Sequence, residues 1–283
     1  MKRFYPCLLF FFVFPVSYAQ EELLEELQSE LQENTTITSV FKGLKIVNLE
    51  STKLAAQGDL YFVIAHRFSS VKGGLKELYG LDGAKIRFSF IYGLTDWMTV
   101  GLSRSSMDKI YDASAKLKIH NQEKNGFPVS IVAFGSMAYK SANPDFSYVR
   151  FEDKHRVNYL AELLISRKMN DALSLQIAPI YWHENFTPFD TQENSQYGLG
   201  FGGRYKLSKR WTLNVDYVAH ANRAAQNTYV NPLSIGFDIE TGGHVFQIHF
   251  TNSQQMNDSG FLNGNGDWAS GDVFFGFNLL RVF

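Results

Sequence analysis

Cysteine is almost missing from this chain, whose 283 residues include a single one, Cys7. Cys7 lies in an apolar N-terminal stretch that we expect to be removed on export, so the mature protein should contain neither a disulfide nor a reactive thiol. It stands at the start of the apolar run, which is not where a lipoprotein carries its lipidated cysteine. Stability must therefore come from packing or from a membrane.

Two further absences narrow the class of protein. No stretch after residue 20 is apolar enough to cross a bilayer as a helix, which needs about 20 residues. The formal net charge of −1 leaves no basic excess, so we expect no nucleic-acid partner. With 283 residues, the chain could form one large domain or two small ones.

The N-terminus has the composition of an export signal. The stretch "MKRFYPCLLFFFVFPVSYAQ" carries Lys2 and Arg3, then an apolar run over residues 7–14, then a small-residue cleavage signal. This order is typical of a secretory signal peptide, so we predict that residues 1–19 are removed and that the mature chain begins at Gln20. A membrane anchor is the alternative, and the shortness of the apolar run disfavours it.

Residues 20–56 are predicted to form a periplasmic leader. Within "EELLEELQSELQ", leucines fall on one face at helical spacing with glutamates around them, which predicts a short amphipathic helix. These leucines are Leu23, Leu24, Leu27 and Leu31. A solvated helix or mobile leader is one interpretation, and a helix that docks on a periplasmic protein or lipoprotein is the other. A coiled coil would need more heptads.

From residue 57 onwards the side chains alternate with a period of two. In "RFSFIYGL", Phe88, Phe90 and Tyr92 lie on one face of a strand, and Arg87 and Ser89 lie on the other. About twelve such segments occur, each near the roughly 9–11 residues of a tilted membrane-spanning strand. The predicted strands are 57–67, 84–93, 97–105, 110–120, 128–140, 156–169, 173–183, 196–207, 210–220, 233–240, 244–252 and 271–283.

The connections between these strands alternate between short and long, with two exceptions, the short outer loop "SMDK" and the long inner turn "HNQEKNGF". Tight turns such as "TDW", "MNDA" and "SKR" are followed by long polar links, which is the pattern of an outer-membrane barrel with periplasmic turns and longer external loops. We therefore predict an all-β fold, a single antiparallel transmembrane β-barrel of about 12 strands over residues 57–283. The expected location is the outer membrane of a Gram-negative cell, and a soluble β-sandwich is the alternative.

The chain ends on "GDVFFGFNLLRVF". Val273, Phe275 and Phe277 would face lipid, and Arg281 could reach the headgroups. The ending resembles the C-terminal strand of Gram-negative outer-membrane proteins, whose terminal aromatic residue is recognised during barrel assembly. The resemblance implies that Phe283 is an assembly signal, with outer-membrane lipid and the barrel-assembly machinery as partners.

Several segments together resemble one family. They are "VFKGLKIVNLEST", "GDLYFVIAHRFSS", "LYGLDGAKIRFSFIYGLTDWMTVGLSRSS" and "GFPVSIVAFGS". They are similar to domain-of-unknown-function family 5777, a family of outer-membrane β-barrels, over most of the mature chain. The stretch "HRFSS" departs from the pattern, because a glycine is expected after its phenylalanine. The resemblance implies fold and location and adds no catalytic residue.

A glycine-rich stretch invites a cofactor interpretation. "GLGFGG" fits the dinucleotide pattern through Gly198, Gly200 and Gly203, but that pattern requires a helix after it, and another strand follows here. A line of inward glycines that leaves room for a bulky neighbour is favoured instead. We expect no cofactor.

The sequence gives little support for an enzyme. The metalloprotease and hydrolase signatures H-E-x-x-H and G-x-S-x-G are missing, and the nearest membrane-facing pair is His66 with Ser69 or Ser70. The loop "NDSGFLNGNGDWASGD" has oxygen ligands at alternate positions but lacks the terminal glutamate of a calcium loop. We predict no metal and no catalytic residue, and we keep a lipid-modifying barrel enzyme of the hydrolase or deacylase type as the alternative.

The functional prediction depends on the charged side chains that face the lumen. With the apolar face of each strand toward lipid, the lumen-lining charges are Lys85, Arg87, Lys116, Lys118, Glu162, Arg204, Lys206, Asp216, Asp238 and Glu240. Opposite charges across a narrow lumen should pair, because an unpaired charge away from water is costly. We predict a constricted lumen, and thus a narrow pore, a transport-type barrel or a scaffold for periplasmic partners. A wider channel in which these charges are hydrated is the alternative.

Overall fold

The computed structural model describes residues 36–37, 40–143, 151–187, 189–241 and 244–283. The predicted signal peptide and the predicted amphipathic helix lie outside the described residues. Among the residues described, no helix is both long and apolar enough to span a bilayer.

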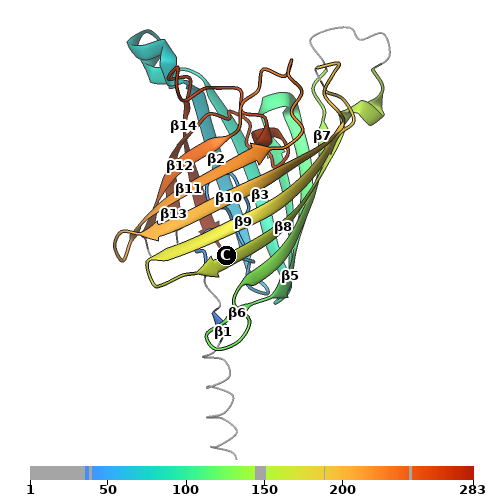
Figure 1. The fold of residues 1–283 in the computed structure, drawn as a ribbon. Helices are drawn as coiled ribbons and strands as arrows, with labels where there is room; N and C mark the ends of the chain where they lie inside the picture. The colour runs from blue at the N-terminus through green and yellow to red at the C-terminus, as the bar shows by residue number, and fades with distance from the viewer. Residues whose placement is uncertain (1–35, 38–39, 144–150, 188, 242–243) are drawn as a thin grey trace, which may run out of the picture. The chain divides into compact units, whose positions relative to one another are not determined.

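Twelve antiparallel strands close into one barrel in the described chain (Figure 1), which confirms the predicted fold. Each barrel strand pairs with its neighbours in chain order, and β14 closes the barrel against β2. The strands are β2 (Leu60–Ser70), β3 (Ala84–Thr95), β4 (Met98–Ser105), β5 (Ile110–His120), β7 (Ser130–Lys140), β8 (Val157–Lys168), β9 (Leu173–Glu184), β10 (Ser195–Lys206), β11 (Trp211–His220), β12 (Leu233–Thr241), β13 (His244–Thr251) and β14 (Phe274–Val282).

Six short elements accompany the barrel strands in the described chain. They are β1 (Thr36–Ile37), β6 (Gln122–Glu123) and the 3₁₀ helices η1 (Val71–Gly80), η2 (Met107–Lys109), η3 (Asp153–Arg156) and η4 (Gly260–Leu262). Figure 1 shows that the longer connections gather at one end of the barrel, the long-loop end, and that the short turns lie at the other, the short-turn end.

The outer face of the barrel follows the period-two pattern. On β3, Phe90 is 53 % exposed and its neighbour Ser89 is buried. On β11, the outward Trp211 is exposed, while Thr212 is buried. Because successive side chains of a strand point to opposite faces, this alternation gives an apolar exterior and a separate inner face.

The C-terminal strand completes the barrel. The Phe283 amide donates to the Leu60 carbonyl at 2.9 Å, and the Leu60 amide donates back to the Phe283 carbonyl at 3.1 Å. On the outer face, Phe275 stacks on Phe68 with ring centroids 5.6 Å apart. The last residue therefore lies at the seam, and its predicted role as an assembly signal stays a prediction.

The structure differs from the sequence analysis before residue 57. Residues 40–56, here called the inner segment, were assigned to a periplasmic leader, but they include buried residues such as Ile46, Leu49 and Ser51 that contact the inner face of the barrel. Residues 253–262, here called the inner loop, follow β13 and are also largely buried. The lumen is therefore filled by two pieces of the chain.

Candidate functional site

The inner segment folds back on itself as a tight turn. Lys45 and Glu50 form an antiparallel β-bridge, the Ser51 amide donates to the Leu44 carbonyl at 3.0 Å, and the Ile46 amide donates to the Leu49 carbonyl at 2.8 Å. These bonds leave the amides at the tip of the turn without partners inside the segment. They must be satisfied by the barrel, because unpaired buried amides are costly.

Asp216 on β11 satisfies those amides. Its Oδ2 atom accepts from the backbone amides of Val47, Asn48 and Leu49 at 3.0, 2.7 and 2.9 Å. Successive amides that converge on one point form an anion-binding concavity, so a carboxylate fits there. Asp216 was predicted to line the lumen, and the structure shows it holding the tip of the inner segment.

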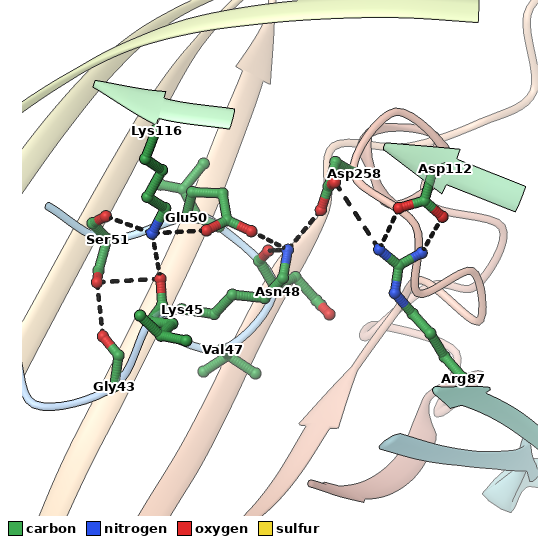
Figure 2. Close-up of polar contacts among 12 residues, drawn as sticks. Gly43, Lys45, Val47, Asn48, Glu50, Ser51, Arg87, Asp112, Lys116 and Asp258 are labelled. Carbon is green, nitrogen blue, oxygen red and sulfur yellow. Dashed lines mark hydrogen bonds and ion pairs between the residues drawn. The ribbon is translucent and has the colours of Figure 1, made fainter. Parts of the chain in front are cut away.

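Lys116 on β5 holds the base of the same turn (Figure 2). Its Nζ atom donates to the backbone carbonyls of Leu44, Ser51 and Lys53 at 2.7, 2.8 and 3.1 Å. The same ammonium lies 2.8 Å from the Glu50 carboxylate. One wall residue thus fixes both limbs of the turn.

The inner loop joins the inner segment through Asp258. The Lys45 Nζ atom lies 2.5 Å from both the Asp258 and the Glu50 carboxylates. The other oxygen of Asp258 lies 3.8 Å from the guanidinium of Arg87, which makes two bonds to Asp112 at 2.7 and 2.6 Å. Figure 2 shows these groups as one chain of contacts from β5 to the loop.

Burial and ion pairing oppose each other in this chain. Burial disfavours the charged form of Lys45, but Asp258 and Glu50 raise its pKa above the ordinary value. Burial likewise disfavours the Asp258 carboxylate, yet Lys45 and Arg87 hold its pKa below the ordinary value. Three basic and three acidic side chains are thus joined by ion pairs in this part of the barrel interior.

Further hydrogen bonds extend this anchorage. The Asn48 Oδ1 atom accepts from Arg67 of β2 at 2.9 Å, and its Nδ2 atom donates to Ser234 at 2.9 Å. Arg67 also donates to the carbonyl of Ser253 at the start of the inner loop. Gln247 donates to the Ile46 carbonyl at 2.7 Å. Four barrel strands therefore contact the tip of one short turn, and Arg67 links that tip to the inner loop.

An apolar cluster fills the other side of the lumen. It unites residues from the inner segment, the inner loop and the inner faces of β7, β8, β9 and β11. Its buried members are Val40, Phe41, Ile46, Leu49, Val132, Phe134, Leu160, Leu164, Ala178, Ile180, Trp182, Val218, Phe261 and Leu262. The barrel interior is therefore in part a hydrophobic core, which a water-filled pore lacks.

The inward glycines make room for this core. A Cβ atom at Gly200 would lie 3.1 Å from the side chain of Leu49, and one at Gly202 would overlap Ile46. A Cβ atom at Gly236 would lie 3.2 Å from Val47. The prediction that the glycines of β10 leave room for a bulky neighbour is confirmed, and the neighbour is the inner segment.

The structure places the predicted lumen residues in three groups. Those buried on the inner face are Arg87, Lys116, Glu162, Arg204, Asp216 and Asp238. Lys118 is half-buried near the short-turn end, Lys85 and Lys206 are exposed at the ends of their strands, and the side chain of Glu240 lies outside the described part.

The buried charges pair differently from the sequence prediction. The sequence predicts that opposite charges pair across a narrow lumen, but in the structure Lys116 pairs with Glu50 and Asp216 binds backbone amides. Both of these partners belong to the inner segment. Neither carboxylate oxygen of Glu162 has a hydrogen-bond partner among the described residues.

Several residues of this site were missed in the sequence. Lys45, Glu50 and Asp258 lay in segments taken for a leader and an external loop, and Arg67 and Asp112 were omitted from the lumen list. Asp112 could have been found, because it shares the inner face of its strand with Lys116 at even spacing. No local sequence pattern indicates that Lys45, Glu50 and Asp258 lie inside the barrel.

The structure gives other roles to the residues weighed for chemistry. His66 stacks on Phe277 with ring centroids 4.6 Å apart, and no acid completes a triad with it among the contacts described. Asp258 of the calcium-like loop is an ion-pair partner inside the barrel. Within the described ranges, no group of three or more His, Cys, Asp or Glu side chains is placed to hold a metal ion.

Comparison with known proteins identifies the family. The family model described as a membrane bound beta barrel domain, domain-of-unknown-function family 5777, matches residues 41–283. The chain belongs to this family. The match begins within the inner segment, so the family's domain includes most of the piece that fills the lumen. No curated protein sequence matches the chain.

Solved structures show the same fold. The KdgM porin has a TM-score of 0.50 at 12% identity, over 79% of this chain and 99% of that chain. The NanC porin has a TM-score of 0.50 at 10% identity, over 79% of this chain and 98% of that chain. At these identities the likeness concerns the fold alone.

Proposed function

We propose that the protein is a narrow outer-membrane pore in a closed state, with the inner segment and the inner loop as the closure. The porin fold of the similar structures supports the pore, and the filled lumen supports the closed state. We propose further that a cleaved signal peptide directs its export, and that it has no enzymatic activity.

The orientation follows from the connections. Short turns of such barrels lie in the periplasm and long loops lie outside. The inner segment leads into β2 near the short-turn end, where the Gly58 amide donates to the Gly93 carbonyl at 2.9 Å. The inner segment therefore enters the lumen from the periplasmic side, and the inner loop enters from outside.

The observation that carries the proposal is the polar anchorage of the inner segment. A permanent filling would be stabilised best by apolar contacts, because buried ion pairs contribute little net stability against hydrophobic replacements. Here the inner segment packs in the apolar cluster, but its turn is also held by Asp216 and Lys116 through backbone groups and one carboxylate. Such bonds can exchange for water when the segment leaves, which suits a closure that opens.

A scaffold for periplasmic partners is the second candidate. The same filled lumen favours it, because a barrel that never opens would serve to hold the leader at the membrane. The two functions differ in one measurable property, the conductance after the inner segment is displaced.

Glycine substitutions on β10 test the proposal. Gly202→Val should expel Ile46 and open the pore, since even a Cβ atom overlaps that side chain. Gly203→Val is the matched control, because its Cβ atom faces outward and meets only Leu175 at 3.7 Å. We expect planar-bilayer conductance to rise for Gly202→Val alone, and to return toward wild type in the Gly202→Val/Ile46→Ala double variant.

A second variant tests the proposal if Gly202→Val does not fold. Asp216→Ala keeps the wall shape and leaves three amides without their acceptor. Folding is checked by different migration of boiled and unboiled protein on a denaturing gel. Folded variants that all conduct no better than wild type would reject the pore and leave the scaffold.

A further inference from the structure

One exposed apolar segment has no part in the filled lumen. Residues 71–83, here called the rim loop, join β2 to β3 at the long-loop end and include η1. The large apolar side chains of this loop are exposed rather than packed on the barrel, and Leu75 is 78 % exposed. They are Leu75, Leu78, Tyr79 and Leu81. A group of exposed apolar side chains marks a contact surface.

The base of the rim loop is fixed to the barrel. The Val71 amide donates to the Val273 carbonyl beside β14 at 2.9 Å, and the Ser69 amide donates to the Gly83 carbonyl at 2.9 Å. The η1 helix contacts both β2 and β14, and Figure 1 shows its coil, in teal, beyond the outline of the strands. The rim loop therefore projects outward on the side of the barrel formed by β14 and β2.

The backbone of the rim loop is strained where its apolar side chains are exposed. Leu78 and Tyr79 have φ angles of 44° and 52°, in the left-handed region that bulky residues rarely adopt. Such conformations cluster where a protein positions groups for a contact. Both side chains are about half exposed, so the contact that would use them lies outside this chain.

A row of tyrosines marks the membrane interface on the other side of the barrel. An exposed, outward tyrosine lies near the long-loop end of each of β5, β7, β8, β9 and β10. These residues, here called the tyrosine girdle, are Tyr111, Tyr139, Tyr159, Tyr181 and Tyr197. Rings with a polar tip form such belts at headgroup level in membrane barrels. The tyrosine girdle therefore gives the level of the interface at this end.

The tyrosine girdle is interrupted on the side of the rim loop. There the outward rings are those of Phe68, Phe250 and Phe275, which stack with centroids 5.6 and 5.4 Å apart. Phenylalanine has no polar group to offer the headgroups. Val71 follows Phe68 by three residues, a distance of roughly 10 Å along an extended strand. The rim loop therefore begins at the interface, and Tyr79 supplies an exposed tyrosine on this side.

We propose that the rim loop inserts its apolar side chains into the outer leaflet of the membrane beside β14 and β2, where the tyrosine girdle is interrupted. Leu75, Leu78 and Leu81 reach the boundary of the acyl chains, and Tyr79 lies among the headgroups. Amphipathic segments bury their apolar face about 5–10 Å deep in this region. The choice of leaflet rests on the orientation proposed above, but the contact with lipid does not depend on conduction.

The position of the rim loop favours lipid over a second copy of the chain. The outer face of β2 and β14 directly below the loop is apolar and faces lipid, so the exposed leucines continue an established lipid contact. The loop also contains charged residues, Lys72, Lys76 and Glu77, which are exposed. Such a mixed composition is typical of segments that lie in the interface.

Spin-label accessibility tests this contact in vesicles of phosphatidylethanolamine and phosphatidylglycerol. A nitroxide on Leu75→Cys is exposed to oxygen, which concentrates in lipid, and to a water-soluble nickel chelate. Phe90→Cys on the outer face is the lipid reference, and Ala225→Cys, exposed in another loop at the long-loop end, is the matched control. We expect the ratio of oxygen to nickel accessibility at Leu75 to approach that at Phe90. It should exceed the ratio at Ala225 by at least about fivefold, because water is excluded from the bilayer interior.

The other results would overturn the proposal. A ratio at Leu75 equal to that at Ala225 would place the rim loop in water. Shielding from both reagents, with spin–spin broadening that disappears on dilution with unlabelled protein, would identify a second copy as the occupant. Leu81→Cys provides the same test if Leu75→Cys does not fold, as judged by the migration of boiled and unboiled protein. None of these measurements involves conductance, so the pore and the lipid contact can fail separately.

Discussion

The inner face of the barrel has two unlike regions. The apolar inner wall consists of the apolar inward residues of β7, β8 and β9, among them Val132, Leu164 and Trp182, and these strands also carry buried polar residues such as Glu162. The charged inner wall lies on β2, β3, β5 and β11 and includes Arg87 and Asp216. Both walls bind the same inner segment. The apolar inner wall binds it by burying apolar surface, and the charged inner wall binds it by hydrogen bonds and ion pairs.

This difference assigns separate tasks to the two walls. Apolar burial is non-directional and scales with area, so the apolar inner wall stabilises the filled lumen without specifying the register of the inner segment. Hydrogen bonds and ion pairs are directional, so the charged inner wall fixes which residue lies where. A segment held by both walls is stable and has one fixed register. It can leave the lumen only when water replaces its hydrogen bonds and ion pairs.

The largest expected effect is a break in the charged inner wall. Arg87→Ala removes the partner of Asp112 and one of the two cations beside Asp258. An uncompensated buried charge costs about 3–5 kcal/mol. We expect the free energy of unfolding in guanidinium, measured on the folded barrel in detergent, to fall by about 4 kcal/mol.

The control for that variant lies on the outer face. Arg104→Ala removes a guanidinium that stacks over the Tyr111 ring at 5.2 Å, outside the lumen. Its effect should stay below about 1 kcal/mol, as for other exposed charges. Equal losses for the two variants would show that the charged inner wall has no special part in stability.

A cavity in the apolar inner wall should lower the free energy of unfolding somewhat less than Arg87→Ala does. Leu164→Ala deletes a fully buried side chain of the filled lumen, and large-to-small changes of this kind cost about 2–5 kcal/mol. We expect a loss near 3 kcal/mol in the same unfolding measurement. Leu163→Ala is the matched control, because this neighbour is 38 % exposed on the outer face. If the two leucines gave the same loss, the interior would be wet rather than packed.

The sequence predicted the outer face of this barrel better than its inner face. Lipid selects apolar residues at every second position, so "RFSFIYGL" was enough to place Phe88, Phe90 and Arg87 on the correct faces. The twelve strands and the inward glycines followed from the same local pattern. These features depend on residues that are close in the sequence.

The filled lumen depends on contacts between distant residues. Asp216 binds amides 167–169 positions away, and no spacing rule connects them. One signal was present, since Leu160 and Leu164 are apolar on the inward face of β8 where a pore wall would be polar. An apolar inward face requires an apolar partner, but it does not name which segment provides it.

The smallest expected effect is that of pH on the inner loop. The pKa of Asp258 is lowered in the folded protein, so its contribution is fully present above the ordinary carboxyl pKa of about 3.9 and is lost as pH falls through the lower folded value. Protection of residues 253–262 in hydrogen exchange should therefore be constant from pH 8 to 5 and should fall below about pH 4. The Asp258→Asn variant should lack this step, and a loss of protection that begins near neutral pH would point to another group.

If the inner segment closes the lumen, it must leave the lumen before ions can pass. A disulfide between Val47→Cys and Gly236→Cys tests it, because a Cβ atom at Gly236 lies 3.2 Å from a Val47 methyl carbon that is one bond from its own Cβ. The chain's own Cys7 lies in the predicted signal peptide, so this disulfide would be the only one.

The deciding measurement is bilayer conductance of that double variant in the Asp216→Ala background, before and after reduction. We expect no conductance while the disulfide is formed, and conductance equal to that of Asp216→Ala once dithiothreitol breaks it. Gly236→Cys with Asp216→Ala should conduct under both conditions. Conductance that is the same with the disulfide formed and broken would contradict the claim, because ions would then pass with the inner segment still fixed in the lumen.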